Sequence, residues 1–185
     1  MEQTKYFPTV EAIEKASGVL EEILTPTPFQ KNNNLSDIYD AEVFLKREDL
    51  QMVRSYKIRG AYNKIRSIDP ENMKNGIVCA SAGNHAQGVA FSCSKLQIMG
   101  SIFMPTTTPK QKIEQVRMFG KEYIDIVLTG DTFDAANAAA IEFARKSGKT
   151  FIPPFDDPKI MEGQGTIGHE IVNQSKEKLD YIFIP

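Results

Sequence analysis

A lysine between two arginines is the residue of this sequence that most clearly could take part in chemistry. Lys57 stands in the stretch RSYKIRGAY, residues 54–62, with Arg54 before it and Arg59 after it. Burial and nearby positive charge both favour the unprotonated amine, and only that form attacks a carbonyl carbon. The alternative is an ordinary surface lysine, because lysines are rarely buried. The pattern alone leaves open whether Lys57 is a nucleophile or a solvated charge.

A second polar stretch lies where an expected strand meets an expected helix. The sequence CASAGNHAQG, residues 79–88, supplies Ser81 and Asn84 as hydrogen-bonding side chains and Gly83 as a point of close backbone approach. In open parallel sheets, ligands bind beyond the carboxyl ends of the strands, at helix N-termini whose free N–H groups attract anions. The alternative is a simple helix start that Ser81 or Asn84 caps.

Other chemical candidates are weaker. The stretch GQGTIG, 163–168, lacks the G-x-G-x-x-G spacing of a dinucleotide site, so packing is its expected role. The stretch KRED, 46–49, is expected to be a solvated loop, and His169 is expected to be structural. Cys79 and Cys93 lack the spacing of a metal site, and no metal is expected.

The composition is that of an ordinary globular chain of 185 residues. A net charge of -2 without a basic stripe gives no reason to expect a nucleic-acid partner. The apolar runs have the length of strands, so no membrane partner is expected. The N-terminus MEQTKYFPTV has no apolar signal core, and a cytoplasmic location is the resulting prediction.

Strands and helices are expected to alternate along the chain. Periodicity predicts helices at 9–24 (capped by Thr9), from about Lys57, from about Ala86, after Thr108, at 131–148 (capped by Asp131 or Thr132, stopped at Gly148) and at 163–174. It predicts a short strand at 42–49 that runs into a charged loop, and strands at 76–81, 100–105, 123–130, at the start of 150–158 and at 180–185. Residues 25–37 are rich in turn formers and are expected to be irregular. This alternation predicts an α/β fold with a parallel sheet.

Two local features complete this outline. Thr108 is the expected N-cap of its helix, with Pro109 at the first position, Gln111 in a capping box and Gly120 past the end. The chain stops at LDYIFIP, inside an expected buried strand, and natural domains rarely end there. The ending predicts a fragment of a longer protein.

Two long motifs resemble one known family. The stretches LKREDLQMVRSYKIRGAY, 45–62, and ASAGNHAQGVAFS, 80–92, are similar to the N-terminal portion of the threonine dehydratases (threonine ammonia-lyases) of the biosynthetic type. Further likeness follows in the same order over nearly the whole chain, in FMPTTTPKQKIEQVRMFG, PPFDDPKIMEGQGTIGHEI and DYIFIP. The resemblance implies the tryptophan-synthase-β-like, fold type II architecture of enzymes that use pyridoxal 5'-phosphate.

The resemblance also implies three cofactor contacts. Lys57 matches the lysine that forms a Schiff base with the cofactor aldehyde and, once freed, takes the Cα proton of the substrate. Asn84 matches the asparagine that binds the cofactor 3-hydroxyl. Tyr56 stands where the family commonly has a phenylalanine beside the cofactor.

Substrate binding is implied for the loop between the strand and the helix. Ser81, Gly83, Asn84 and His85 match the loop whose hydroxyl and backbone N–H groups bind the substrate carboxylate. Serine racemases resemble SSGNH at this place, and their second serine acts as an acid and base on the other face of Cα. Ala82 cannot do so, which favours a dehydratase without racemase activity.

The same resemblance implies two domains. Residues 53–153 would form a small α/β domain, and residues 1–52 and 154–185 would begin a larger cofactor-binding domain that is truncated. In the family this larger domain continues into a glycine loop that holds the cofactor phosphate and a serine or cysteine that faces the pyridine nitrogen. A domain that senses isoleucine often follows. None of these features lies within the present sequence.

The expected activity is the conversion of L-threonine to 2-oxobutanoate and ammonia, the first step toward isoleucine. Family members form homo-oligomers, and a homotetramer is expected here. A catabolic serine/threonine dehydratase is the nearest alternative. Another alternative is a catalytically silent fragment that keeps Lys57 without holding the cofactor, and the truncated chain is itself expected to be inactive.

Overall fold

The computed structural model describes residues 6–184 of the chain. Its α-helices are α1 (Val10–Leu20), α2 (Asn33–Tyr39), α3 (Lys57–Arg66), α4 (Pro70–Met73), α5 (Asn84–Leu96), α6 (Lys110–Gly120), α7 (Phe133–Ser147) and α8 (Pro158–Gln174). Its strands are β1 (Phe29–Lys31), β2 (Phe44–Lys46), β3 (Ile77–Ala80), β4 (Gly100–Met104), β5 (Ile124–Leu128) and β6 (Thr150–Phe151). Two 3-10 helices follow β2 and α6, at Glu48–Leu50 and Lys121–Tyr123.

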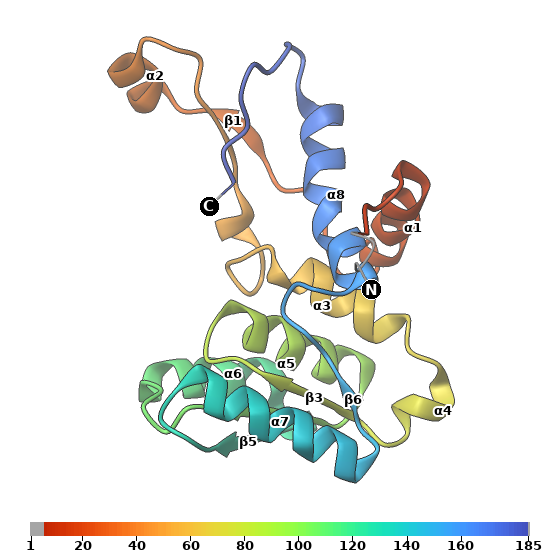
Figure 1. The fold of residues 1–185 in the computed structure, drawn as a ribbon. Coiled ribbons are helices and arrows are strands. Elements are labelled where there is room, and N and C mark those ends of the chain that lie inside the picture. The colour runs from red at the N-terminus through yellow and green to blue at the C-terminus, as the bar shows by residue number, and fades with distance from the viewer. Residues whose placement is uncertain (1–5, 185) are drawn as a thin grey trace.

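A parallel sheet organises the lower half of the molecule in Figure 1. Its strand order is β5-β4-β3-β6, and every neighbouring pair is parallel. In the register, Cys79 lies opposite Ile102, which in turn lies opposite Ile126. Parallel neighbours need crossover connections, which the intervening helices supply. The predicted α/β fold with a parallel sheet is confirmed.

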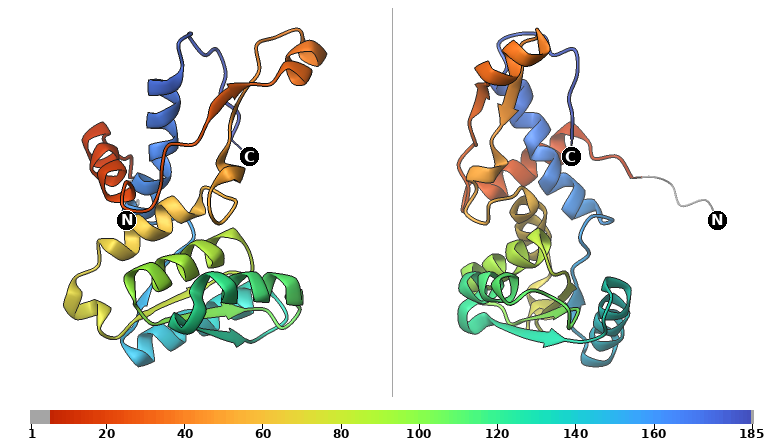
Figure 2. Two further views of the ribbon diagram at one scale, coloured as in Figure 1. Left: turned by 180° about the vertical axis from the view of Figure 1, so that it is seen from behind. Right: turned by 90° about the vertical axis from the view of Figure 1, so that its left-hand side faces the viewer.

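Alternate side chains of β3 pack against different helices. Ile77 and Cys79 belong to the apolar cluster that includes residues of α5 and α6. Val78 and Ala80 pack instead with Ala140 of α7. All four β3 residues are buried because helices cover both faces of the sheet, and a strand covered on both faces needs apolar residues throughout. Figure 2 shows α7 on the face opposite α5 and α6.

The helix α3 lies between α5 and α8, and glycines allow both close contacts. A Cβ added at Gly163 of α8 would lie 2.5 Å from the carbonyl oxygen of Arg59. A Cβ added at Gly88 of α5 would lie 3.1 Å from the backbone of Lys57 and Ile58. Gly163 therefore has the packing role that was predicted for the stretch 163–168, whereas a Cβ added at Gly168 would meet nothing within 4 Å. Figure 1 shows α3 above α5 and below α8.

A buried charge network binds α3 to α8 and to the chain that follows β2. The Arg59 side chain is 1% exposed, and its guanidinium donates to Glu48 Oε1 at 2.8 Å and to Glu170 Oε1 at 2.6 Å. Lys46 also pairs with Glu170 and donates to Gln174 Oε1 at 2.8 Å. Burial raises the pKa of Glu170, but the hydrogen bonds from Arg59 and Lys46 outweigh it and bring this pKa below its ordinary value.

This network corrects the prediction of a solvated loop at residues 46–49. The side chains of Lys46 and Glu48 are only 7% and 12% exposed. Arg47 and Asp49 do form a more exposed pair, at 2.8 Å. Successive side chains alternate in direction, so Lys46 and Glu48 point inward while Arg47 and Asp49 point outward. Because all four residues are charged, the sequence shows no apolar–polar alternation that would have revealed this.

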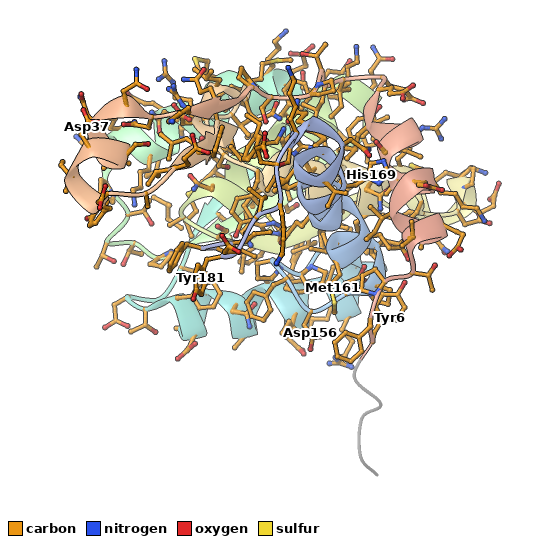
Figure 3. The ribbon with its side chains drawn as sticks, turned by 90° about the horizontal axis from the view of Figure 1, so that it is seen from above. Tyr6, Asp37, Asp156, Met161, His169 and Tyr181 are labelled. Atoms are coloured by element: carbon orange, nitrogen blue, oxygen red, sulfur yellow. The ribbon has the colours of Figure 1, made fainter. Side chains whose placement is uncertain are left out.

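The segment predicted to be irregular contains two elements. β1 pairs antiparallel with β2, with Gln30 opposite Leu45, and α2 follows β1 directly. Asn32 caps α2 by accepting a hydrogen bond from the N–H of Leu35 at 2.9 Å. The prediction was wrong because the asparagines were taken as turn formers, whereas one of them caps a helix. This arm projects from the body of the molecule, and Asp37 marks its edge in Figure 3.

Some of the predicted helix caps and helix ends are confirmed, and others are wrong. Thr9 caps α1 and Thr132 caps α7, as predicted, and Gly148 ends α7 in the left-handed region at φ +70°. The predicted Thr108 cap is wrong, because its hydroxyl donates to the Pro105 carbonyl at 2.7 Å and α6 begins after Pro109 without a side-chain cap. α1 ends at Leu20 and not at residue 24.

The end of the chain also differs from the prediction. α8 begins at Pro158, before the predicted start at residue 163, with Asp157 as its N-cap. The buried strand predicted at 180–185 is absent from the described residues 180–184, where Tyr181 and Phe183 are 82% and 91% exposed. Pro185 lies outside the described residues, as do residues 1–5 of the N-terminal stretch that was examined for a signal.

Two features are absent from residues 6–184. No helix in this range has the length and apolar content needed to cross a membrane. No group of three or more histidine, cysteine, aspartate or glutamate residues in this range could hold a metal ion.

We expect the substitution Arg59→Leu to lower the free energy of unfolding by about 3–5 kcal/mol, because it removes the buried guanidinium that pairs with both Glu48 and Glu170. Urea unfolding followed by circular dichroism measures this loss. The matched control is Arg66→Leu on the same helix, where the ion pair is 3.7 Å long and the arginine side chain is 49% exposed. This control should change the value by no more than about 0.5 kcal/mol. Equal losses in the two variants would contradict the assigned importance of the network.

Candidate functional site

The first candidate residue, Lys57, opens α3. The turn before it closes with a hydrogen bond from the N–H of Arg54 to the carbonyl of Gln51 at 2.8 Å, and Arg54 has a φ of +55°. Tyr56 occupies the N-cap position, and its side chain makes no cap hydrogen bond. The Lys57 amine donates to the carbonyl of Pro154 at 2.9 Å and lies 5.3 Å from the centre of the Tyr56 ring. The lysine is therefore held in a defined place and is not a freely solvated charge.

Burial lowers the pKa of the Lys57 amine. The direction of this pKa shift agrees with the sequence prediction. The flanking arginines, however, do not contribute to the shift as predicted. The charge of Arg59 is balanced by two carboxylates, and Arg54 is exposed. A lower pKa increases the fraction of unprotonated amine, which is the nucleophilic form.

The second candidate stretch is an uncapped helix N-terminus. The N–H of Ser81 donates to the carbonyl of Phe103 at 3.0 Å, and the N–H of Gly83 donates to Ser81 Oγ at 3.2 Å. Gly83 is the N-cap of α5 and no side chain caps the helix. The alternative interpretation, a cap by Ser81 or Asn84, is therefore wrong. The N–H groups that open the helix at Asn84 remain directed at the space beyond the strands.

Space for a ligand exists at this loop. A Cβ added at Gly83 would meet nothing within 4 Å, and the Asn84 side chain is exposed. Ser81 is half-buried and offers its hydroxyl beside the helix start. A small polar loop of this kind can hold an anion without placing a competing carboxylate next to it.

His85 connects this loop to the segment 152–154, which leads from β6 toward α8. Its Nε2 lies 3.0 Å from the carbonyl oxygen of Ile152, two residues before the carbonyl that accepts the Lys57 hydrogen bond. Burial lowers the pKa of His85 to about 4, more than the hydrogen bond to Ile152 raises it, and the charge of Lys57 lowers it further. The two predicted stretches are thus brought together by the segment 152–154.

Sequence reasoning missed two parts of this site. Among the described residues, two buried side-chain polar atoms have no hydrogen-bond partner, Ser55 Oγ and His85 Nδ1, and both belong to residues near Lys57. Ser55 was not singled out, although it stands two positions before Lys57. The carbonyls of Ile152 and Pro154 were also missed, and no sequence signal could have found them because every residue has a carbonyl.

The remaining histidine lies elsewhere. His169 is in α8, as predicted, and is half-buried. Figure 3 shows it on the side of α8 that faces α1. Gly165, one turn earlier on this side, would bring an added Cβ within 3.1 Å of Ile13 of α1. This position is consistent with the structural role that was predicted for His169.

Comparison with known sequences identifies similar proteins. The family model described as pyridoxal-phosphate dependent enzyme matches residues 20–185. The chain is 56% identical over 174 residues to the biosynthetic L-threonine dehydratase IlvA of Halalkalibacterium halodurans and 53% identical to that of Bacillus subtilis. Each match covers 94% of this chain but 42% and 41% of the relative, so the chain spans about two fifths of the length of these curated relatives.

Comparison with solved structures gives the same result. The processed form of threonine deaminase isoform 2 from Solanum lycopersicum matches with a TM-score of 0.82 and 42% identity, over 94% of this chain and 48% of that chain. Maize serine racemase matches with a TM-score of 0.87 and 27% identity, over 93% of this chain and 51% of that chain. The resemblance inferred from the motifs and the fold type II architecture are confirmed.

We expect His85 to make folding stability depend on pH. A histidine in the unfolded chain titrates near pH 6.5, whereas the pKa of folded His85 is about 4. The unfolded chain therefore binds a proton that the folded chain does not bind in this window. The His85 contribution is fully present above about pH 6.5 and is lost as the pH falls toward 4, by at most about 1.4 kcal/mol for each pH unit.

Urea unfolding between pH 7 and pH 4 in the variant His85→Asn measures this contribution. The variant should have a flatter dependence on pH than the unchanged chain. The substitution His169→Asn is the matched control and should leave the His85 contribution in place. Parallel curves for His85→Asn and the unchanged chain would refute the assignment.

Proposed function

The chain belongs to the family of pyridoxal-phosphate-dependent enzymes, and from this premise we propose that it carries the catalytic lysine of a threonine dehydratase. The reaction converts L-threonine to 2-oxobutanoate and ammonia and would serve isoleucine synthesis. The observation that carries the proposal is the Lys57 amine, half-buried and with a lowered pKa, beside an uncapped helix N-terminus. The similarity to proteins named biosynthetic L-threonine dehydratase supports this choice of substrate.

The residues present fit the cofactor. Lys57 offers an amine that burial shifts toward its nucleophilic form, and Tyr56 offers an aromatic ring next to it. The buried Ser55 Oγ, two positions before Lys57, has no hydrogen-bond partner among the described residues, which supports a polar group being bound there. Lys57 would hold the cofactor covalently, and Asn84 would bind its ring hydroxyl.

Pyridoxal phosphate, when bound, withdraws electrons from the substrate and so favours loss of the Cα proton and of the Cβ hydroxyl. Lys57, displaced by the amino group of threonine, would accept the Cα proton. The Ser81 hydroxyl and the N–H groups of Asn84 and His85 would bind the substrate carboxylate, and the N-terminus of α5 would stabilise its negative charge.

Three broader features belong to the same proposal. Residues 53–153 would form the smaller domain, and residues 1–52 and 154–185 would contribute to the larger one. The protein would act in the cytoplasm as a homotetramer. These features rest on the resemblance to the dehydratases, and sedimentation of the purified protein would test the oligomeric state.

Serine is the alternative substrate, because the structural likeness extends to maize serine racemase. Ala82 has no hydroxyl to exchange a proton on the second face of Cα, which favours dehydration over racemisation. Turnover of threonine and serine by the full-length protein, each with and without isoleucine or AMP, would separate a biosynthetic from a catabolic dehydratase. Faster turnover of serine, activated by AMP, would contradict the proposed substrate.

We expect pyridoxal phosphate to be captured at Lys57. The chain is mixed with pyridoxal phosphate, reduced with borohydride and digested, and the peptide that carries the phosphopyridoxyl group is identified by mass spectrometry. The substitution Lys57→Met should abolish the label on this peptide, and the matched control Lys64→Met, on the same helix, should retain it. A label spread evenly over the surface lysines would refute the proposed role of Lys57.

We also expect Asn84 to contribute to cofactor binding and Ser81 to substrate binding. Asn84→Ala should weaken the binding of pyridoxal phosphate, followed by its absorbance, by about tenfold for each 1.4 kcal/mol of lost interaction. Ser81→Ala should leave cofactor binding nearly unchanged and weaken the effect of added threonine on the absorbance of the bound cofactor. Unchanged values in both variants would show that the loop has only a structural role.

A further inference from the structure

Three parts of the chain meet around Lys57. The contact between α5 and α3 is fixed at Gly88, where an added Cβ would lie 3.1 Å from the carbonyl carbon of Lys57. His85 stands three positions before Gly88 and so lies on the same face of α5. The segment 152–154 completes the group, because Pro154 accepts a hydrogen bond from Lys57 at 2.9 Å and Ile152 lies 3.0 Å from His85 Nε2.

These contacts determine the tautomer of His85. A carbonyl oxygen can only accept a hydrogen bond, so Nε2 must carry the proton that it donates to Ile152. The ring is neutral because it is buried, and Nδ1 therefore bears a lone pair. His85 is 4% exposed as a residue, and its Nδ1 has no partner among the described residues. A buried acceptor without a partner destabilises the protein, and bulk water does not reach this one.

Lys57 and His85 contact carbonyls two residues apart in the segment 152–154, and Lys57 has an unused donor. A neutral amine has two N–H groups and one lone pair. One hydrogen bond, to Pro154, is formed. The side chain has several rotatable bonds, so its amine can turn about this hydrogen bond without a change in the backbone.

We propose that Nδ1 of His85 accepts a second hydrogen bond from the Lys57 amine and that His85 is thereby a positioning residue for this amine. In the unprotonated form of the amine, Pro154 O and His85 Nδ1 then bind both N–H groups. The lone pair remains free to attack an aldehyde. The proposal rests on the proposed role of Lys57 as the cofactor lysine.

The tautomer excludes a different role for the His85 side chain. Nδ1 without a proton cannot donate to a carboxylate, and Nε2 is already used. The substrate carboxylate can therefore receive a hydrogen bond from His85 only through its backbone N–H. The ring of His85 binds the Lys57 amine, and the backbone N–H of His85 binds the substrate carboxylate.

The first test needs neither cofactor nor threonine. In the 15N-labelled chain, two-dimensional NMR should show His85 with Nε2 protonated and Nδ1 unprotonated. The substitution Lys57→Met removes the donor while keeping a side chain of similar length, and it should shift the Nδ1 resonance with little change at Nε2. The matched control Lys95→Met, on the same helix as His85, should leave both resonances in place. A protonated Nδ1, or an Nδ1 resonance that is the same with and without Lys57, would overturn the proposal.

The second test measures the reactivity of the amine. Capture of pyridoxal phosphate at Lys57 under reducing conditions should be about tenfold slower in His85→Phe, which keeps a ring but loses the acceptor. His85→Asn should restore much of the rate because its amide oxygen can accept in place of Nδ1. An unchanged rate in His85→Phe, or equal slowing in both variants, would overturn the proposal.

The two experiments separate this proposal from the proposed function. A chain that captures no pyridoxal phosphate at Lys57 would contradict the role of the lysine. The NMR result would still show whether Lys57 and His85 share a hydrogen bond.

Discussion

The buried guanidinium of Arg59 is the interaction on which the rest of the structure depends. It binds Glu48, which follows β2, and Glu170 of α8, and Lys46 shares the second carboxylate. Buried charges are tolerated only when all of them are paired, so few arrangements of these elements are possible. The network fixes the rotation of α3 about its axis. Because two residues of a helix turn the side-chain direction by about 200°, Lys57 points away from the charges that hold Arg59.

Close packing extends this constraint to the site. Gly163 lets α8 approach the backbone of Arg59, and Gly88 lets α5 approach the backbone of Lys57. The two contacts lie within one turn of α3, so the helix cannot shift along its axis without a collision on one side. The Lys57 amine on this fixed helix reaches the carbonyl of Pro154, and its lowered pKa follows from burial. The chemical property of the lysine is therefore a consequence of how α3 is held.

Prediction from the sequence succeeded where the residue types strongly favour one local structure. The strand of β3 was predicted because both of its faces are apolar, and the end of α7 because Gly148 adopts a positive φ. It failed where a side chain can form either a helix cap or a hydrogen bond within a turn. Thr108 binds the carbonyl of Pro105 and does not cap α6, and Asn32 caps a helix in a segment that was predicted to be irregular. The positions of Lys57 and of the loop at Asn84 were predictable, but the carbonyls that link them come from the tertiary fold.

The two arginines of the opening motif show why electrostatic effects cannot be read from sequence distance. Both stand close to Lys57 in the chain, yet Arg59 is neutralised by carboxylates distant in sequence and Arg54 is exposed. Desolvation alone lowers the pKa of the amine. A desolvated amine has lost hydrogen bonds to water, so its N–H groups need acceptors within the protein. The carbonyl of Pro154 and the vacant Nδ1 of His85 meet this need, which explains why a neutral histidine is buried beside a lysine.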